Sequence, residues 1–173
     1  MSNKRLIKEV SGTSVSVLQL TNVFSADFDL YELELFFTES TDVDNIDLRF
    51  INSSGNAILT TKYDYCHEDM NAYGAFSENK TTGSQQYDNI AISHTNSTTN
   101  GAACAYIFNP FSSSSYTSII SSSSNYFNAS YRRRQNIGAL KQTNSCTGIE
   151  LRTNLVGSLS SITARVYGIR VDS

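Results

Sequence analysis

The last segment of the chain alternates between apolar and polar residues. In an extended chain, one face of residues 161–171 carries apolar or small residues, namely Ile162, Ala164, Val166 and Gly168. The opposite face carries Thr163, Arg165 and Tyr167. A period of two residues is that of a β-strand with one face in the core. The pattern predicts a half-buried antiparallel strand that closes the fold.

The same period recurs earlier in the chain, most clearly over residues 30–37. The residues expected inward there are Tyr31, Leu33, Leu35 and Phe37. A strand over residues 46–50 follows, with Ile46, Leu48 and Phe50 expected inward and Asp47 and Arg49 outward. Residues 52–56 predict a turn, because glycine and asparagine tolerate positive φ. This turn predicts a hairpin between residues 46–50 and 57–66.

Other segments are less regular. Residues 14–20, 89–94 and 102–110 predict strands, the last ending at Pro110, which has no N–H to donate to a ladder. Residues 67–76 fit a strand or a covering loop, and residues 78–86 and 95–101 are polar enough for loops. Two serine runs, 112–115 and 121–124, flank residues 116–120. A linker is one interpretation, but the apolar segment between the runs favours a strand bounded by loops. Residues 126–135, 138–142 and 146–153 predict further strands.

About ten short strands with regular turn signals predict an all-β protein. We expect a single antiparallel β-sandwich, jelly-roll-like, over residues 13–173, preceded by an N-terminal arm over residues 1–12. Helix content should be small, because no long segment keeps a period of 3.6 residues.

Composition narrows the classes of partner. Charged residues make up 17% of the 173 residues and the net charge is −3, so no general cationic field draws the chain to nucleic acid. An apolar run of about 18 residues, as a membrane span needs, is missing. The first residues have the charges of a signal peptide without its apolar core, which predicts synthesis in the cytoplasm.

The cysteine, histidine and acidic residues of the sequence indicate no catalytic or metal-binding site. Cys66, Cys104 and Cys146 are an odd number at wide spacings, which predicts buried free thiols rather than disulfides or a zinc site. The run from Cys66 to Asp69 points alternately to opposite faces if it is extended, so it cannot converge on one metal ion. Asp42 and Asp44 lack the rest of a calcium loop and predict a solvated hairpin loop. His94 is expected in solvent. We therefore expect no catalytic residue, cofactor or metal.

Two basic clusters are the candidate partner-contact residues. Lys4, Arg5 and Lys8 lie on the expected arm. Arg132 and Arg134 share one face of an expected strand, near Tyr126, Phe127 and Tyr131, which resembles a platform for stacking and cation–π contacts. Nucleic acid is one candidate partner, an acidic protein surface is favoured by the net charge, and a solvated strand face is the alternative.

The terminal pattern Ile-x-x-x-x-Tyr-Gly-Ile, from Ile162 to Ile169, together with the Ser- and Asn-rich β texture, resembles small virion surface proteins of tailed bacteriophages. The resemblance implies a non-enzymatic virion structural protein, made in the host bacterial cytoplasm. A capsid decoration (cement) protein is expected first. It would be a homotrimer that binds the major capsid protein or other virion proteins and stabilises the head.

The alternative function is a tail-fibre or receptor-binding module that recognises carbohydrate. Tyrosine beside asparagine and aspartate can stack on sugars and hydrogen-bond to them, and the chain has 10 Tyr but no Trp. Surface glycans are the ligand in this interpretation.

Overall fold

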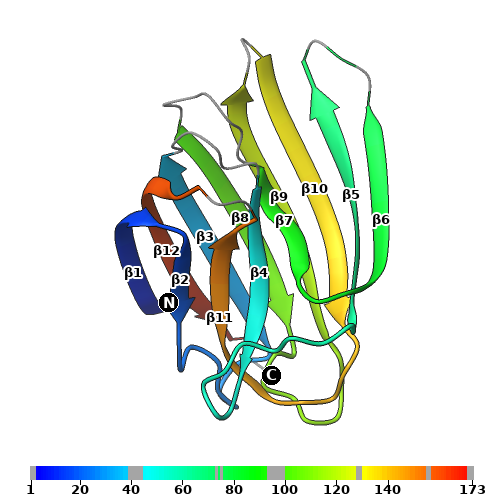
Figure 1. Ribbon diagram of the computed structural model, residues 1–173. Coiled ribbons are helices and arrows are strands. Elements are labelled where there is room, and N and C mark those ends of the chain that lie inside the picture. The colour runs from blue at the N-terminus through cyan, green and yellow to red at the C-terminus, as the bar shows by residue number, and fades with distance from the viewer. Residues whose placement is uncertain are drawn as a thin grey trace.

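The computed structural model describes residues 3–38, 45–72, 74, 76–92, 100–127, 130–154 and 157–170. These residues form twelve β-strands and no helix (Figure 1). The strands are β1 (Lys4–Val15), β2 (Val17–Leu20), β3 (Leu30–Thr38), β4 (Asn45–Asn52), β5 (Tyr63–Asn71), β6 (Ser77–Ser84), β7 (Tyr87–Ile92), β8 (Asn100–Phe108), β9 (Thr117–Phe127), β10 (Ser130–Leu140), β11 (Cys146–Thr153) and β12 (Leu159–Ile169). Within the described ranges there is no helix long and apolar enough to cross a membrane.

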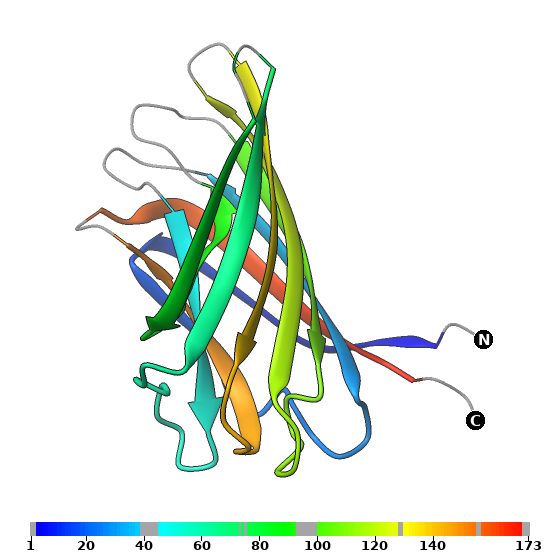
Figure 2. The same ribbon diagram turned by 90° about the vertical axis from the view of Figure 1, so that its right-hand side faces the viewer.

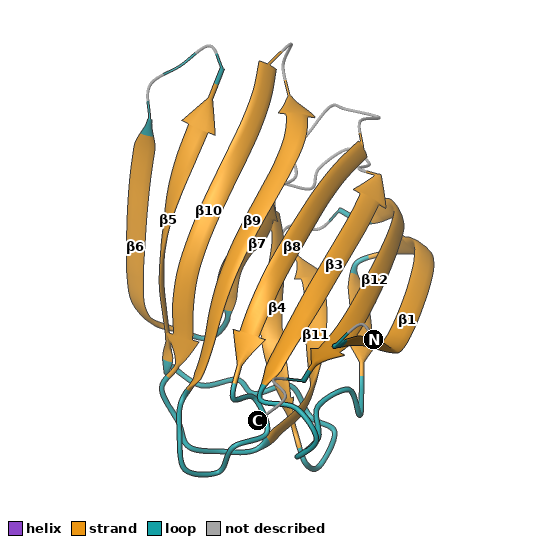
Figure 3. Cartoon of the chain, turned by 180° about the vertical axis from the view of Figure 1, so that it is seen from behind, coloured by secondary structure: helices purple, strands orange, loops and turns teal. Residues whose placement is uncertain are grey.

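The strands build two antiparallel sheets packed face to face. The larger sheet has the order β1-β12-β3-β8-β9-β10-β5-β6, and the smaller one has the order β2-β11-β4-β7. Figure 1 looks onto the smaller sheet, whereas Figure 3 looks onto the outer face of the larger sheet. The prediction of an all-β antiparallel sandwich is confirmed. The jelly-roll topology stays a prediction.

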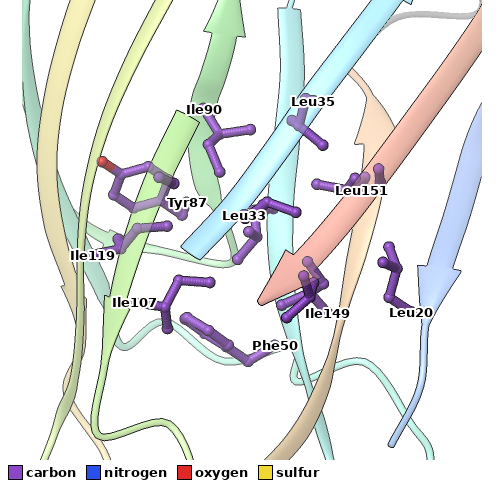
Figure 4. Packing of buried hydrophobic residues seen from close by; sticks show 14 of the residues in the cluster. Leu20, Leu33, Leu35, Phe50, Tyr87, Ile90, Ile107, Ile119, Ile149 and Leu151 are labelled. Carbon is purple, nitrogen blue, oxygen red and sulfur yellow. The ribbon is translucent and has the colours of Figure 1, made fainter. Parts of the chain in front are cut away.

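The hydrophobic core lies between the two sheets (Figure 4). From the larger sheet it receives the four predicted residues of β3, Tyr31, Leu33, Leu35 and Phe37, each at most 3% exposed. From the smaller sheet come residues of β4 and β11, namely Ile46, Leu48, Phe50, Ile149 and Leu151. Burial of this many large side chains fixes the register of the central strands, because a slip of one residue would turn every one of them to solvent.

The closing strand has the orientation that its pattern predicted. In β12, Ile162, Ala164, Val166 and Gly168 are all buried. Gly168 lies under the ring of Phe28, where an added Cβ would lie 2.6 Å from Cδ2 of that ring. Glycine is therefore required at this position by the close approach of an aromatic side chain.

The expected N-terminal arm is wrong for residues 4–12. They belong to β1, which pairs with β12 from Lys4 opposite Ile169 to Val15 opposite Leu159. An edge strand needs backbone pairing on one side only, so a weak apolar pattern is enough to hold it. Ser14 has a φ of 53° at the end of β1, just before β2 begins in the other sheet. Figure 2 shows the start of β1 and the end of β12 leaving the body side by side.

The predicted turn at residues 52–56 is confirmed, but the predicted hairpin is wrong. The N–H of Asn52 donates to the carbonyl of Asn56 over 2.9 Å, and Gly55 has a φ of 80°. The chain then crosses to the larger sheet, where β5 begins at Tyr63. The hydroxyl of Tyr63 donates to the carbonyl of Ile58 over 3.3 Å and accepts from the N–H of Phe50 over 3.0 Å. The apolar pattern finds the strand but does not say to which sheet it belongs.

Two segments expected as loops are strands. Residues 77–84 form the edge strand β6, which pairs with β5 despite its polar sequence. The serine run 121–124 lies inside β9, where Ser121 and Ser123 are 3% and 2% exposed. Strands on both sides of β9 provide partners for its backbone groups, and this pairing outweighs the weak strand preference of serine.

The alternation of residues 46–50 also predicted the wrong environment for Asp47. It was expected in solvent but is 1% exposed. The side-chain amide of Gln86 donates to its Oδ2 over 2.7 Å, so the carboxylate is covered by the residues that precede β7. A buried carboxylate of this kind is tolerated because a donor replaces water.

Candidate functional site

The outer face of the larger sheet carries exposed apolar side chains on three adjacent strands. Tyr106 of β8 lies opposite Ile120 of β9, which lies opposite Ile137 of β10. These side chains are 41%, 47% and 55% exposed, and we call them the apolar row. Cross-strand partners lie side by side on one face of a sheet, so the three form one continuous strip. Contiguous exposed apolar surface is a feature of binding sites.

A polar row runs beside the apolar row and is offset from it by two residues on β9 and β10. It consists of Ser122, Gln135, Glu68 and Glu78, each opposite the next on β9, β10, β5 and β6. Glu68 and Glu78 are both exposed and directly opposite one another. The register of five strands therefore places hydrogen-bonding groups along the edge of an apolar strip.

The two rows lie in a groove of about 880 Å³. Its walls are Cys104 and Tyr106 of β8 on one side and Glu78 to Lys80 of β6 on the other. This volume is within the range of small-molecule sites. In Figure 3 this surface is the area from β8 to β6, in front of which no other described strand lies.

Beyond β8, a network of charged side chains extends the face toward β1. Lys4 Nζ donates to Glu32 Oε1 and Glu34 Oε1 over 2.8 and 2.9 Å and lies 3.9 Å from the ring centre of Tyr167. Burial lowers the pKa of Lys4, but the hydrogen bonds that it donates to both carboxylates outweigh burial and raise that pKa above its usual range. Lys4 is thus half-buried and bonded to carboxylates of its own chain.

The carboxylate of Glu32 also raises the pKa of two residues that line the groove, Cys104 and Tyr106. Burial and then the charge of Glu32 raise the pKa of the Cys104 thiol to about 11. Its Sγ lies 3.7 Å from Glu32 Oε1. The charge of Glu32 also raises the pKa of the neighbouring Tyr106. Both groups stay protonated near neutral pH, so Tyr106 presents a neutral ring and a hydroxyl donor to the groove.

Arg132 and Arg134 lie on the inner face of β10, opposite to the groove, where Arg132 is half-buried and Arg134 is buried. Arg134 is 9% exposed, and its Nε and Nη2 donate to the two carboxylate oxygens of Asp69 over 2.5 and 2.6 Å. Its Nη1 donates to Asn45 Oδ1 over 3.2 Å. The two arginines do share a face, as predicted, but that face is turned away from solvent. The arginine of this run that faces solvent is Arg133.

The other two residues of the N-terminal basic cluster, Lys8 and Arg5, differ in their surroundings. Lys8 Nζ donates to the carbonyl of Thr21 over 2.9 Å, so it joins β1 to the segment after β2. Arg5 is exposed on β1 opposite Gly168. Of the five predicted contact residues, Arg5 is therefore the one whose side chain is well exposed.

His67 is buried beside the ion pair. It is 8% exposed and its Nδ1 is buried without a hydrogen-bond partner. Burial, followed by the charge of Arg134, lowers its pKa.

The alternation predicted for residues 66–69 is confirmed, because Cys66 and Glu68 face outward while His67 and Asp69 face inward. The described residues contain no group of three or more metal-binding side chains. Asp42, Asp44 and His94 lie outside them.

The cysteines are free thiols, as predicted, but they are not all buried. Cys146 is buried, Cys104 is half-buried and Cys66 is exposed in the groove.

Sequence reasoning missed the groove because the alternation of residues 102–110 places Tyr106 on one face without saying which face is the core. The structure shows that the small Ala103 and Ala105 are on the buried face.

No family model and no curated protein sequence matches the chain. Among solved structures, an exo-inulinase from Aspergillus awamori is similar with a TM-score of 0.38 and 10% identity, over 96% of this chain. The PL-14 alginate lyase from Aplysia kurodai has a TM-score of 0.37 and 8% identity, over 87% of this chain and 72% of the lyase. A VP2 protein of infectious bursal disease virus has a TM-score of 0.16 and 11% identity, over 96% of this chain and 39% of that one. The chain spans 29% of the length of the inulinase. Likenesses this distant carry no argument about function.

Proposed function

We propose that this protein is a non-enzymatic glycan-binding β-sandwich, and that the groove on the outer face of the larger sheet is its binding site. This is the receptor-recognition alternative predicted from the sequence. The main observation in its support is that the apolar row and the polar row lie side by side in one groove.

Sugars offer two kinds of surface that match the two rows. The faces of a pyranose ring are lined by C–H groups, whereas its edges carry hydroxyl groups. The ring of Tyr106 and the side chains of Ile120 and Ile137 provide an apolar strip for such faces. Gln135 provides a donor and an acceptor for hydroxyl groups, and Glu68 provides acceptors. A site with an apolar floor and a few convergent polar groups is the usual form of a small-ligand site.

The test is binding of the purified protein to an array of oligosaccharides, two to eight units long, built from common neutral hexoses and N-acetylhexosamines. We expect Tyr106→Ala to weaken every interaction about two- to tenfold, since an aromatic contact contributes roughly 0.5–1.5 kcal/mol. The matched control is Tyr116→Ala, since Tyr116 is 55% exposed but lies outside the groove. Absence of binding, or equal losses in both variants, would overturn the proposal.

The second candidate function is the virion decoration role, as a homotrimer on a major capsid protein. The observation that favours it is β1, an edge strand whose outer side pairs with no other described strand. Such an edge can add to the sheet of a neighbouring protein through backbone hydrogen bonds. Native mass spectrometry tests the assembly, with a species of about three chains of 19.1 kDa expected and a strict monomer counting against a self-standing trimer.

A further inference from the structure

The outer face of β9 and β10 continues beyond the groove to a second apolar contact area. Along this pair of strands, the outward cross-strand partners are Ile120 with Ile137, Ser122 with Gln135, Ser124 with Arg133, and Tyr126 with Tyr131. The register is continuous from Ser130 to Leu140. Six residues of strand separate the isoleucine pair from the tyrosine pair, which corresponds to about 20 Å.

The tyrosine pair is exposed. The rings of Tyr126 and Tyr131 meet edge to face with centres 5.0 Å apart, and they are 39% and 71% exposed. Such a pair presents two aromatic rings to solvent, with that of Tyr131 the more exposed, where a ligand can contact them. One strip of sheet therefore has apolar contacts at both ends and polar side chains between them.

Charge is distributed unequally along this strip. Arg133 faces outward, and its Nε donates to Ser122 Oγ over 3.2 Å, which fixes the guanidinium over the strip. Arg134 and Arg165 are ion-paired to Asp69 and Glu9, whereas Arg133 has no carboxylate partner in the described parts of the chain. On the neighbouring strands, the groove end of the strip has two facing carboxylates, Glu68 and Glu78, and one cation, Lys80. These three side chains leave one net negative charge there, so an acidic ligand group is favoured beside Arg133 over that end.

We infer that the ligand is an elongated glycan lying along β9 and β10, with neutral sugars over the apolar row, a carboxylate-bearing sugar at Arg133, and its end against Tyr131. The inference rests on the proposed function and specifies the class of glycan. A guanidinium can hold a carboxylate through two parallel N–H bonds, which a neutral sugar cannot accept as well.

The experiment uses matched pairs of oligosaccharides, two to eight units long, with and without one terminal uronic acid, and the full-length protein. The wild type should bind the long acidic member of a pair about tenfold more tightly than its neutral partner. Arg133→Gln should remove this preference, so that the acidic and the neutral partner bind the variant equally. Tyr131→Ala should weaken only the longer members, which reach both ends of the strip. Arg5→Gln is the control, because Arg5 is an exposed arginine on a distant strand.

The outcomes separate this inference from the proposed function. If neutral and acidic partners bind equally, or Arg133→Gln behaves like Arg5→Gln, the inference is overturned while the glycan site stands. If no oligosaccharide binds, both are overturned. Binding of single-stranded DNA with the same dependence on Tyr131 and Arg133, and no glycan binding, would also overturn both in favour of a nucleic-acid surface. Unfolding curves of each variant confirm that it is folded before its affinity is compared.

Discussion

Replacing Arg134 by leucine is expected to destabilise the protein far more than replacing the adjacent Arg133. The two residues are neighbours in the chain but lie on opposite faces of β10. Arg134 forms a bidentate ion pair with Asp69 between the sheets, whereas Arg133 faces solvent and bonds only Ser122 among the described residues. Arg134→Leu leaves the carboxylate of Asp69 in a largely dry environment without its partner.

The magnitude follows from the burial of both partners. The side chains of Arg134 and Asp69 are 10% and 16% exposed, so water can screen little of the loss. Removing one member of a buried pair costs about 3–5 kcal/mol, and the partial exposure of Asp69 favours the lower end. For a chain of this size, about 3 kcal/mol lowers the melting temperature by roughly 6–12 °C. Arg133→Leu should change the free energy of unfolding by less than about 0.5 kcal/mol.

Urea unfolding at neutral pH measures both variants, and the double variant Asp69→Leu/Arg134→Leu completes the cycle. The double variant should recover part of the loss, because it leaves no unpaired charge in the sandwich. Equal costs for Arg133→Leu and Arg134→Leu would refute the reasoning.

The difference between wild type and Arg134→Leu should also depend on pH. Burial raises the pKa of Asp69, but the hydrogen bonds from Arg134 outweigh it and lower that pKa below its usual value. The stabilisation is therefore complete above the unfolded value of about 3.9 and is lost as the pH falls through the lower folded value. A difference that persists unchanged in acid would show that the ion pair is not its source.

Three further predictions concern other buried groups. Burial lowers the pKa of His67, so the free energy of unfolding should fall as the pH drops below about 6.5, because the unfolded chain takes up the proton more readily. Urea unfolding from about pH 7.5 to 5 measures this slope, and His67→Gln should flatten it. Gly138→Ala would place a Cβ 2.7 Å from the carbonyl oxygen of Asp64 and against the ring of Tyr87, and should cost about 1–3 kcal/mol, whereas substitution at exposed Gly74 should not. A thiol reagent should label exposed Cys66 in the folded protein but Cys146, whose pKa burial raises to about 11, only during unfolding; equal labelling rates would contradict the fold.

Hydrophobic periodicity determined the class of fold and the inward residues of the best strands. The alternations of residues 30–37 and 162–168 each place their apolar members in the core, because one face of a strand must leave water. The same reasoning failed for residues 4–12, 78–84 and 121–124. These segments are strands because a neighbouring strand supplies partners for their backbone groups, and that information lies elsewhere in the chain.

The candidate site depends on tertiary structure for the same reason. Tyr106, Ile120 and Ile137 come from three strands, and only the register of β8, β9 and β10 makes them one row. The sequence could state that Arg132 and Arg134 share a face opposite to Arg133, since a strand alternates. It could not state which of these faces is covered by the second sheet. Packing of the two sheets decided that Arg134 is part of the interior and that Arg133 faces solvent, because a strand has two faces and only its neighbours determine which one is buried.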